Sequence, residues 1–211
     1  MEDSALDILK KVNAITTNSH IVLTTGRHSD GYINLDKLMP HTEESSKMGM
    51  IFAKKYKNVD IDVVAGPAIG GIILSQWVAY HLSKLKGKEI LSVFAEKDQN
   101  KNQIIERGFD KLVKGRKVLV VEDFTTTGGS VKSAAESVKK AGGNIVEICV
   151  ILNREPDKVN SATIGLPFTS LDEFKVQSWA EEECPLCKQN VPINTELGHG
   201  KEFLEKKAKN G

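Results

Sequence analysis

The chain has 211 residues, enough for one well-buried domain but too few for two full-sized ones. Lysine and arginine total 29 against 28 aspartate and glutamate residues, so the net charge of +1 argues against nucleic-acid and anionic-membrane surfaces as partners. No apolar run reaches the ~18 residues of a membrane span, and the acidic start differs from a secretory signal, so we expect a cytoplasmic protein.

The first part of the chain predicts two helices with a hairpin-like segment between them. Residues 4–18 place apolar side chains at helical spacing behind a start that resembles a capping box. Short apolar stretches at 21–23 and 32–34 flank a polar, turn-rich loop, which is typical of a hairpin. A second amphipathic helix is expected over 42–57.

From residue 61 the pattern changes to short apolar strands that alternate with helices. The expected strands cover 61–65, 90–94, 117–121 and 145–152, and the expected helices cover 72–82 and 130–141. This alternation implies right-handed crossovers and an α/β fold with an open, mainly parallel twisted sheet flanked by helices. The periodicity fades beyond Asn153, so we expect a single domain over 1–211 with its core at about 42–155.

Unusual residues follow four of these strands. They are Gly66–Gly71, Glu96–Lys97, Glu122–Ser130 and Asn153–Glu155. Ligands of open α/β sheets bind outside the carboxyl ends of the strands. We therefore expect these four segments to line one crevice.

The third strand end carries the most specific pattern. Glu122 and Asp123 follow a buried strand, where like charges raise each other's pKa and a polyol or a metal ion would offset the cost. The Thr/Gly segment Thr125–Ser130 opens onto a helix and offers backbone N–H groups, hydroxyls and the positive end of a helix dipole to a phosphate. It matches neither a P-loop nor a dinucleotide fingerprint. A diol site followed by a phosphate site predicts a ribose 5-phosphate ligand.

The run Val118–Ser130 resembles the phosphoribosyl-diphosphate motif of type I phosphoribosyltransferases. Four other segments are similar to orotate phosphoribosyltransferases in particular: Thr25–Asn34, Val64–Gly71, Leu152–Glu155 and Cys184–Cys187. The resemblance implies the type I phosphoribosyltransferase fold, with a small hood built from residues 1–41 and 156–211. It also implies a homodimer in which the lid of one subunit reaches the site of the other.

The resemblance further implies a role for each motif residue. Glu122 and Asp123 would bind the ribose hydroxyls, and Arg154 would face the base, with Tyr32 and Thr126 beside it. The 5-phosphate would be held by the loop residues Thr125, Thr126, Thr127, Gly128, Gly129 and Ser130. The pyrophosphate would be held by backbone N–H groups at Ala68, Ile69 and Gly70.

The implied reaction joins orotate to 5-phosphoribosyl 1-diphosphate, giving orotidine 5-monophosphate and pyrophosphate in pyrimidine biosynthesis. Mg²⁺ would be bound through the substrate and not directly by the protein. The polar segment 96–107, poor in β-formers, is the expected lid, with Lys97, Lys101 and Arg107 as its cations. The two lysines and Asp123 are the expected catalytic residues.

Two other functions stay open at this point. The lid lacks the dense Arg/Lys/His cluster of many orotate enzymes, and Gly70 stands where a lysine is common, which leaves a phosphoribosyltransferase for another nucleobase as an alternative. The second alternative is a regulator that senses phosphoribosyl diphosphate without catalysis. Neither alternative predicts a nucleic-acid partner, because the net charge is only +1 and the sequence has no helix-turn-helix pattern.

The three cysteines are too few for a disulfide framework and are expected to be reduced thiols. Cys184-x-x-Cys187 together with His199 suggests zinc, but a structural zinc site uses four ligands. A turn with buried thiols is therefore the preferred interpretation. His28 is expected to be structural or on the surface, and His20 has no partner pattern.

Overall fold

The computed structural model describes residues 3–100 and 102–210, which form two compact units. The larger unit spans Met1–Val12 and Leu35–Phe174, and the smaller unit spans Asn13–Asn34 and Lys175–Gly211. Among the described residues, no helix is both long enough and apolar enough to cross a membrane.

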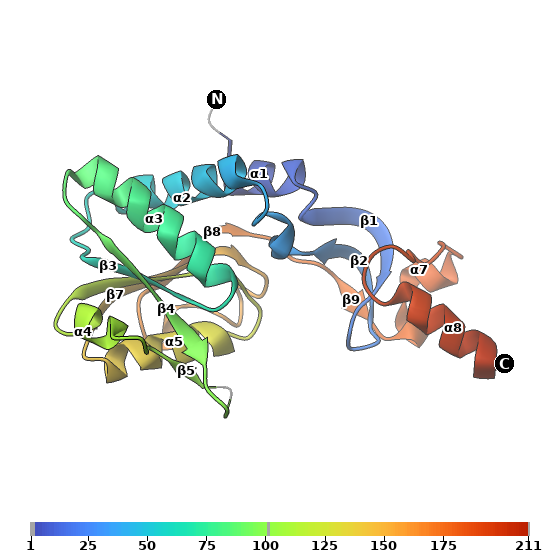
Figure 1. The fold of residues 1–211 in the computed structure, drawn as a ribbon. Helices are drawn as coiled ribbons and strands as arrows, with labels where there is room; N and C mark the ends of the chain where they lie inside the picture. The colour runs from blue at the N-terminus through green and yellow to red at the C-terminus, as the bar shows by residue number, and fades with distance from the viewer. Residues whose placement is uncertain (1–2, 101, 211) are drawn as a thin grey trace. The chain divides into compact units, whose positions relative to one another are not determined.

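A six-stranded sheet forms the centre of the larger unit (Figure 1). Its strands are β3 (Val63–Pro67), β4 (Leu91–Lys97), β5 (Gln103–Ile104), β6 (Lys117–Thr125), β7 (Asn144–Asn153) and β8 (Phe168–Glu173). They lie in the order β5-β4-β3-β6-β7-β8, and every neighbouring pair is parallel except β4 with β5. The expected open, mainly parallel α/β sheet is confirmed.

Helices cover both faces of this sheet. They are α1 (Ala5–Lys11), α2 (Thr42–Tyr56), α3 (Gly70–Lys86), α4 (Phe109–Val113), α5 (Gly129–Lys140) and α6 (Ser161–Ile164), with a 3-10 turn at Leu35–Lys37. α2 and α3 pack together over one face, and α5 lies over the other (Figure 1). Between α5 and the sheet, buried valines such as Val120 on β6 and Val138 on α5 share one core cluster. Branched side chains on the strands and small alanines on the helix allow this close packing.

The first helix is shorter than the expected 4–18. Its capping box is present, since the Asp7 N–H donates to Ser4 Oγ at 3.1 Å and the Asp7 carboxylate accepts from the Ser4 N–H at 3.0 Å. The helix ends at Lys11, and Asn13 then takes a left-handed conformation with φ 54°. Ile15 has helical spacing in the sequence, but it starts a strand and pairs with Ile33. That part of the prediction was wrong because strand pairing overrode the local pattern.

Two segments expected in the hood belong to the larger unit. α1 packs on α2, and the Leu6 N–H donates to Asp172 on β8 at 3.3 Å. β8 pairs with β7 from Phe168 opposite Ile148 onward. The sequence gives β8 a weak signal because it is an edge strand whose side chains are mostly half-buried.

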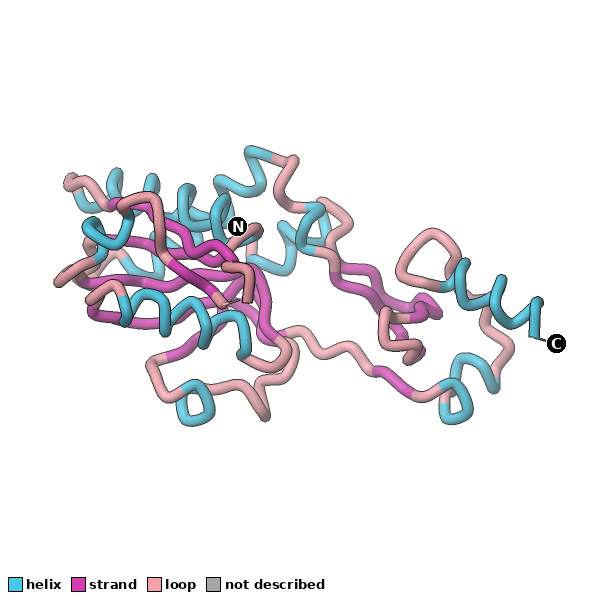
Figure 2. The backbone as a smooth tube through the Cα atoms, turned by 60° about the horizontal axis from the view of Figure 1, so that its bottom comes forward, coloured by secondary structure: helices cyan, strands magenta, loops and turns pink. Residues whose placement is uncertain are grey.

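The smaller unit contains the predicted hairpin in a longer form. Its strands β1 (Ile15–Val22), β2 (His28–Ile33) and β9 (Ser178–Trp179) form an antiparallel sheet in the order β1-β2-β9. Figure 2 draws the strands of the chain in magenta. The 3-10 turn Glu181–Glu183, the helix α7 (Pro185–Lys188) and the helix α8 (Gly200–Asn210) follow. In the described part of this unit, the buried apolar side chains are few: Ala14, Ile15, Ile21, Val22 and Cys184.

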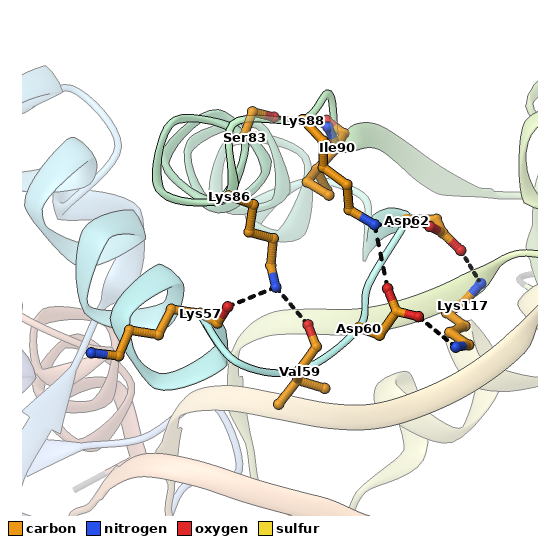
Figure 3. Close-up of polar contacts among 9 residues, drawn as sticks. All are labelled: Lys57, Val59, Asp60, Asp62, Ser83, Lys86, Lys88, Ile90 and Lys117. Atoms are coloured by element: carbon orange, nitrogen blue, oxygen red, sulfur yellow. Dashed lines mark hydrogen bonds and ion pairs between the residues drawn. The ribbon is translucent and has the colours of Figure 1, made fainter.

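Ion pairs gather at the amino ends of β3, β4 and β6 (Figure 3). The Asp60 carboxylate accepts from Lys88 at 3.3 Å and from Lys117 at 2.5 Å, and the Lys86 ammonium donates to the Val59 carbonyl at 2.6 Å. Exposed pairs of this kind contribute at most about 1 kcal/mol each. They lie at the end of the sheet opposite the predicted ligand site.

Candidate functional site

The four predicted strand ends lie along one edge of the larger unit's sheet. β4, β3, β6 and β7 are consecutive and parallel, so that Pro67 lies opposite Ala95 and Thr125 lies opposite Asn153. From β3 the sheet continues through β4 in one direction and through β6 and β7 in the other. The gap between the ends of β3 and β6 is therefore a topological switch point, where open α/β sheets bind ligands.

Two buried carboxylates stand at this switch point. Ser130 Oγ donates to Glu122 Oε2 at 2.7 Å, and the Phe124 N–H donates to Asp123 Oδ1 at 2.7 Å. Burial raises the pKa of Glu122 to about 7 and that of Asp123 to about 6, with smaller contributions from nearby negative charge. Neutral hydrogen-bond donors or a cation at this position would favour the ionised carboxylates.

The loop after β6 has the form of an anion cradle. Gly128 caps the amino end of α5 with φ 76°, and its N–H donates to Thr125 Oγ1 at 3.0 Å. A Cβ on Gly128 would lie 2.7 Å from Ile164 Cδ1, so the loop packs closely on α6. Thr127 is exposed, and its Oγ1 accepts from the N–H of Gly129, the first residue of α5, at 3.4 Å. Backbone N–H groups at the start of a helix bind phosphates.

The loop between β3 and α3 lies directly against Asp123. A Cβ on Gly66 would lie 2.1 Å from the Gly71 carbonyl oxygen, and a Cβ on Gly70 would lie 2.4 Å from Asp123 Oδ2. The Ala68–Ile69 peptide is cis, and Ile69 is exposed. Three backbone N–H groups were predicted to hold pyrophosphate. One of them, the Ala68 N–H, already donates to the Ala95 carbonyl at 2.8 Å.

The contact between Gly70 and Asp123 yields a prediction. Gly70→Ala forces Asp123 to move, because the added Cβ meets both Oδ2 at 2.4 Å and Cγ at 2.9 Å. Moving a binding group by about 1 Å costs up to about 100-fold in activity. We expect a roughly tenfold or larger fall in affinity for phosphoribosyl diphosphate, measured by calorimetry. Gly129→Ala, whose Cβ would meet only Thr127 Oγ1 at 3.5 Å, is the control for thermal stability; equal affinity in Gly70→Ala and the parent would contradict the prediction.

The predicted lid segment forms a β-hairpin. Although this segment is poor in β-formers, β4 pairs with β5, with Glu96 opposite Ile104 and Lys97 opposite Gln103. Its turn is held by Asp98, whose Oδ1 accepts from the N–H groups at 100 and 102, both at 2.8 Å. Side-chain bonds from aspartate to nearby backbone stabilise turns and do not require a β-forming sequence.

The three predicted lid cations differ in their surroundings. Arg107 donates two hydrogen bonds to the Glu96 carboxylate, at 2.7 and 2.9 Å, so its charge is paired. Lys97 is exposed at the end of β4, and its charge lowers the pKa of Glu122. Lys101 lies outside the described residues. The catalytic roles of the two lysines stay predictions.

Arg154 follows β7 and adjoins the phosphate loop. Its N–H donates to the Thr125 carbonyl at 3.0 Å, and burial lowers the pKa of its half-buried guanidinium. The neighbouring Glu155 pairs with Lys158 at 3.2 Å, and its negative charge acts against the effect of burial on the pKa of Arg154. A half-buried guanidinium is suited to a planar anionic ligand.

Tyr32, predicted to lie beside the base, belongs to the smaller unit. It lies on β2 opposite Thr16, and its side chain is half-buried. Its role at the base stays a prediction.

Sequence reasoning missed two features of this site. Asp36, in the 3-10 turn before α2, raises the pKa of Asp123 through its negative charge. A small pocket bounded by Gly70 and Asp123 is otherwise largely apolar, with Leu38 and Trp77 among its walls. Neither feature has a motif, because each depends on how the segment after residue 34 folds back on α3.

Comparisons with known proteins agree with this geometry. The phosphoribosyl transferase domain family matches residues 36–182. The orotate phosphoribosyltransferase of Caldanaerobacter subterraneus is 38% identical over 91% of this chain and 95% of its own, and that of Thermotoga maritima is 40% identical over 88% and 93%.

Solved structures share the fold. The Mycobacterium tuberculosis orotate phosphoribosyltransferase has a TM-score of 0.65 at 23% identity, covering 80% of this chain and 95% of its own. That protein has also been crystallised with 5-phospho-α-D-ribosyl 1-diphosphate. Because the curated relatives match nearly end to end, the chain belongs to the orotate phosphoribosyltransferase family.

Proposed function

We propose that this protein transfers the phosphoribosyl group from 5-phosphoribosyl 1-diphosphate to orotate, giving orotidine 5-monophosphate and pyrophosphate for pyrimidine biosynthesis. The observation that carries the proposal is the contact between the loop at Gly70 and Asp123, one residue after Glu122 and two before the phosphate loop. A diphosphate, a diol and a 5-phosphate would then be held side by side at one switch point.

In the proposed reaction, a pyrimidine ring nitrogen of orotate attacks ribose C1 as the bond from C1 to the pyrophosphate oxygen breaks. The transition state resembles an oxocarbenium ion, so the protein acts chiefly by positioning and by electrostatics. Glu122 and Asp123 accept hydrogen bonds from the ribose hydroxyls. The loop of Thr125–Ser130 holds the 5-phosphate, and the N–H groups of Ile69 and Gly70 hold the pyrophosphate.

Arg154 supplies the base contact in this proposal. Its guanidinium matches the carboxylate of orotate through paired hydrogen bonds, and it lies beside the loop that would hold the 5-phosphate. Thr126, in the same unit as Arg154, supplies a hydroxyl to the base. Lys97 and Lys101 neutralise the leaving pyrophosphate.

The carboxylates also fit a magnesium requirement. Mg²⁺ prefers oxygen ligands, and Glu122, Asp123 and the nearby Asp36 concentrate negative charge at this edge of the sheet. Held by the diphosphate and ribose oxygens, Mg²⁺ would stabilise the charge that develops on the leaving group. Within the chain, the hydrogen bonds from Ser130 Oγ to Glu122 and from the Phe124 N–H to Asp123 lower the pKa values of the two carboxyls and offset part of the effect of burial.

A base panel tests the proposal. The full chain is incubated with phosphoribosyl diphosphate, Mg²⁺ and, separately, orotate, uracil, adenine or hypoxanthine, and pyrophosphate release is followed. We expect pyrophosphate release only in the reaction that contains orotate. Turnover of a purine without orotate would overturn the pyrimidine assignment, and calorimetric binding of phosphoribosyl diphosphate with no turnover of any base would indicate a sensor.

The pKa values of the two carboxylates predict a pH dependence of substrate binding. Because burial raises the pKa of Glu122 to about 7 and of Asp123 to about 6, both ionise at the expense of folding stability as the pH rises from about 4 to 7. Ligands that need the ionised pair bind with proton release. Affinity should therefore rise by up to about 100-fold per pH unit below pH 6, where both carboxyls are protonated, and by up to about tenfold per unit between pH 6 and 7. Calorimetry in buffers of different ionisation enthalpy measures the protons released. Equal proton release by the parent and Glu122→Gln near pH 6.5 would contradict the prediction.

We also propose a cytoplasmic homodimer. All three cysteines are free thiols, which agrees with a reducing compartment. In a shared-site dimer, verified heterodimers of an Asp123→Asn subunit and a Lys101→Ala subunit should recover part of the activity. No recovery would count against a site completed by the partner.

A further inference from the structure

Four metal-ligating side chains converge in the smaller unit, away from every residue with a proposed catalytic role. They are His20, His28, Cys184 and Cys187, and one ligand atom from each lies within 4.8 Å of all the others. The first three are almost fully buried, with exposed fractions of 2%, 0% and 0%. Buried thiols and imidazoles at such short range need an explanation beyond packing.

The strand register brings the two histidines together. Val22 on β1 lies opposite His28 on β2, and His20 is two residues before Val22, so the two histidines are diagonal neighbours on one face. His20 Nε2 lies 2.7 Å from His28 Nδ1. The Phe203 ring packs edge-on against His28 with a centroid separation of 5.1 Å, which shields the pair from water.

The two cysteines come from one turn of chain. Cys184 precedes α7, Pro185 is its first residue and Cys187 its third, so both thiols lie on the same side of the turn. Cys187 Sγ lies 3.3 Å from His28 Nδ1 and 3.7 Å from His20 Nε2, and Cys184 Sγ lies 3.6 Å from His20 Nε2. A Cys-x-x-Cys pair on a tight turn is the usual half of a structural zinc site.

A backbone contact orients one imidazole toward the thiols. His20 Nδ1 lies 2.7 Å from the Val191 carbonyl oxygen, so this nitrogen carries the proton and donates it. Nε2 therefore presents its lone pair to His28 and to both sulfurs. Metal-bound histidines typically donate their second N–H to such a carbonyl, which fixes the ring.

We propose that His20, His28, Cys184 and Cys187 bind one structural Zn²⁺ ion. Tetrahedral zinc places nitrogen and sulfur ligands about 3.5 Å apart, close to the sulfur–nitrogen distances of 3.3, 3.6 and 3.7 Å given above. It places two nitrogen ligands about 3.3 Å apart. The two imidazole nitrogens, now 2.7 Å apart, would therefore separate by about 0.6 Å on binding. Two thiols lose their protons as zinc binds, and the two thiolates balance the charge of the ion. Four protein ligands leave no open position for catalysis.

The site explains how the smaller unit holds together. Its described part buries few apolar side chains, and its two segments, Asn13–Asn34 and Lys175–Gly211, are far apart in the sequence. Small units with limited cores commonly depend on a metal. Zinc would link β1 and β2 from the first segment to α7 from the second.

The proposal corrects the ligand set suggested by the sequence. His199 is outside the cluster, and its Nε2 lies 3.2 Å from Thr24 Oγ1. From the sequence, only three ligands were evident, namely the two cysteines and His199, so metal-free thiols were preferred. In the fold, His199 is not a ligand, and His20 and His28 join the two cysteines to make four.

Metal analysis of the full chain tests the proposal. Protein expressed with added zinc and purified without chelator should contain about one zinc ion per chain. Cys187→Ser and His28→Asn should each lower this content at least about tenfold. The matched controls are Cys149→Ser, which changes the buried cysteine of β7, and His199→Asn; both should keep the metal.

A second measurement covers variants that fail to fold. Parent protein in which Co²⁺ replaces the metal should show the visible absorption of tetrahedral cobalt bound to thiolates, and a chelator should lower the Tm of the zinc-loaded parent. Parent protein with less than about one-tenth of a zinc ion per chain and no cobalt spectrum would overturn the proposal. Equal metal loss in the His28→Asn variant and the His199→Asn control would overturn it as well, as would a Cys184–Cys187 disulfide in freshly purified protein.

Discussion

The double variant Glu122→Gln, Asp123→Asn should lower kcat/KM for phosphoribosyl diphosphate by roughly 1,000-fold, with each single variant losing about 10- to 100-fold. Each substitution replaces a charge-assisted hydrogen bond, worth about 1.5–3 kcal/mol, by a weaker neutral one. Every 1.4 kcal/mol corresponds to a factor of about ten. Initial rates over a range of both substrates, with calorimetric Kd values, measure the effect.

The same double variant should fold at least as stably as the parent. Burial raises the pKa of both carboxylates, so their removal relieves a cost that the empty site carries near neutral pH. Asp60→Asn, at the opposite end of the sheet, is the matched control and should leave kcat/KM within about twofold. A double variant that binds phosphoribosyl diphosphate as tightly as the parent would refute the assigned diol contact.

Arg154→Gln should raise KM for orotate by about 100-fold and leave the Kd for phosphoribosyl diphosphate nearly unchanged. A bidentate, charge-assisted contact to the carboxylate is worth about 3 kcal/mol, and glutamine supplies neither the charge nor the fork. Arg154→Lys keeps the charge without the planar fork. Its KM for orotate should lie between those of the parent and Arg154→Gln, about tenfold above the parent. Steady-state kinetics with orotate as the varied substrate separates the three proteins.

Thermal stability distinguishes a binding role of Arg154 from a structural one. Burial of the guanidinium lowers its pKa and so disfavours its charged form, and its removal should leave Tm unchanged or slightly higher. Arg116→Gln, just before the amino end of β6, is the matched control for loss of an arginine. A large fall in Tm for Arg154→Gln with an unchanged KM would assign the residue to the fold instead.

Much of the sheet follows from the sequence because β3, β6 and β7 each contain a continuous run of buried, mostly apolar residues. β3, β6 and β7 are buried on both faces, and such runs are visible without knowledge of their neighbours. β5 and β8 were missed because their residues are half-buried or depend on a turn, so their pairing is decided by the adjacent strand. Ile15 shows the same limit, since its helical spacing yields to the partner strand at Ile33.

The candidate site divides in the same way. Glu122, Asp123 and the loop to Ser130 form one local motif, and their convergence with Gly66–Gly71 follows from the rule for parallel strand ends. Asp36 has no such signal because it reaches Asp123 through tertiary folding. The four-residue Cys/His cluster was also out of reach, since its members are separated by up to 167 residues and depend on strand register.

The division of the chain into two units has a consequence for synthesis on the ribosome. The larger unit is complete once Phe174 has emerged, whereas the hairpin of Asn13–Asn34 belongs with residues made after it, from Lys175 onward. Folding during translation proceeds from the amino end, so this early hairpin must wait for most of the polypeptide before its partners exist. Without Lys175–Gly211, β2 would lack its pairing partner β9.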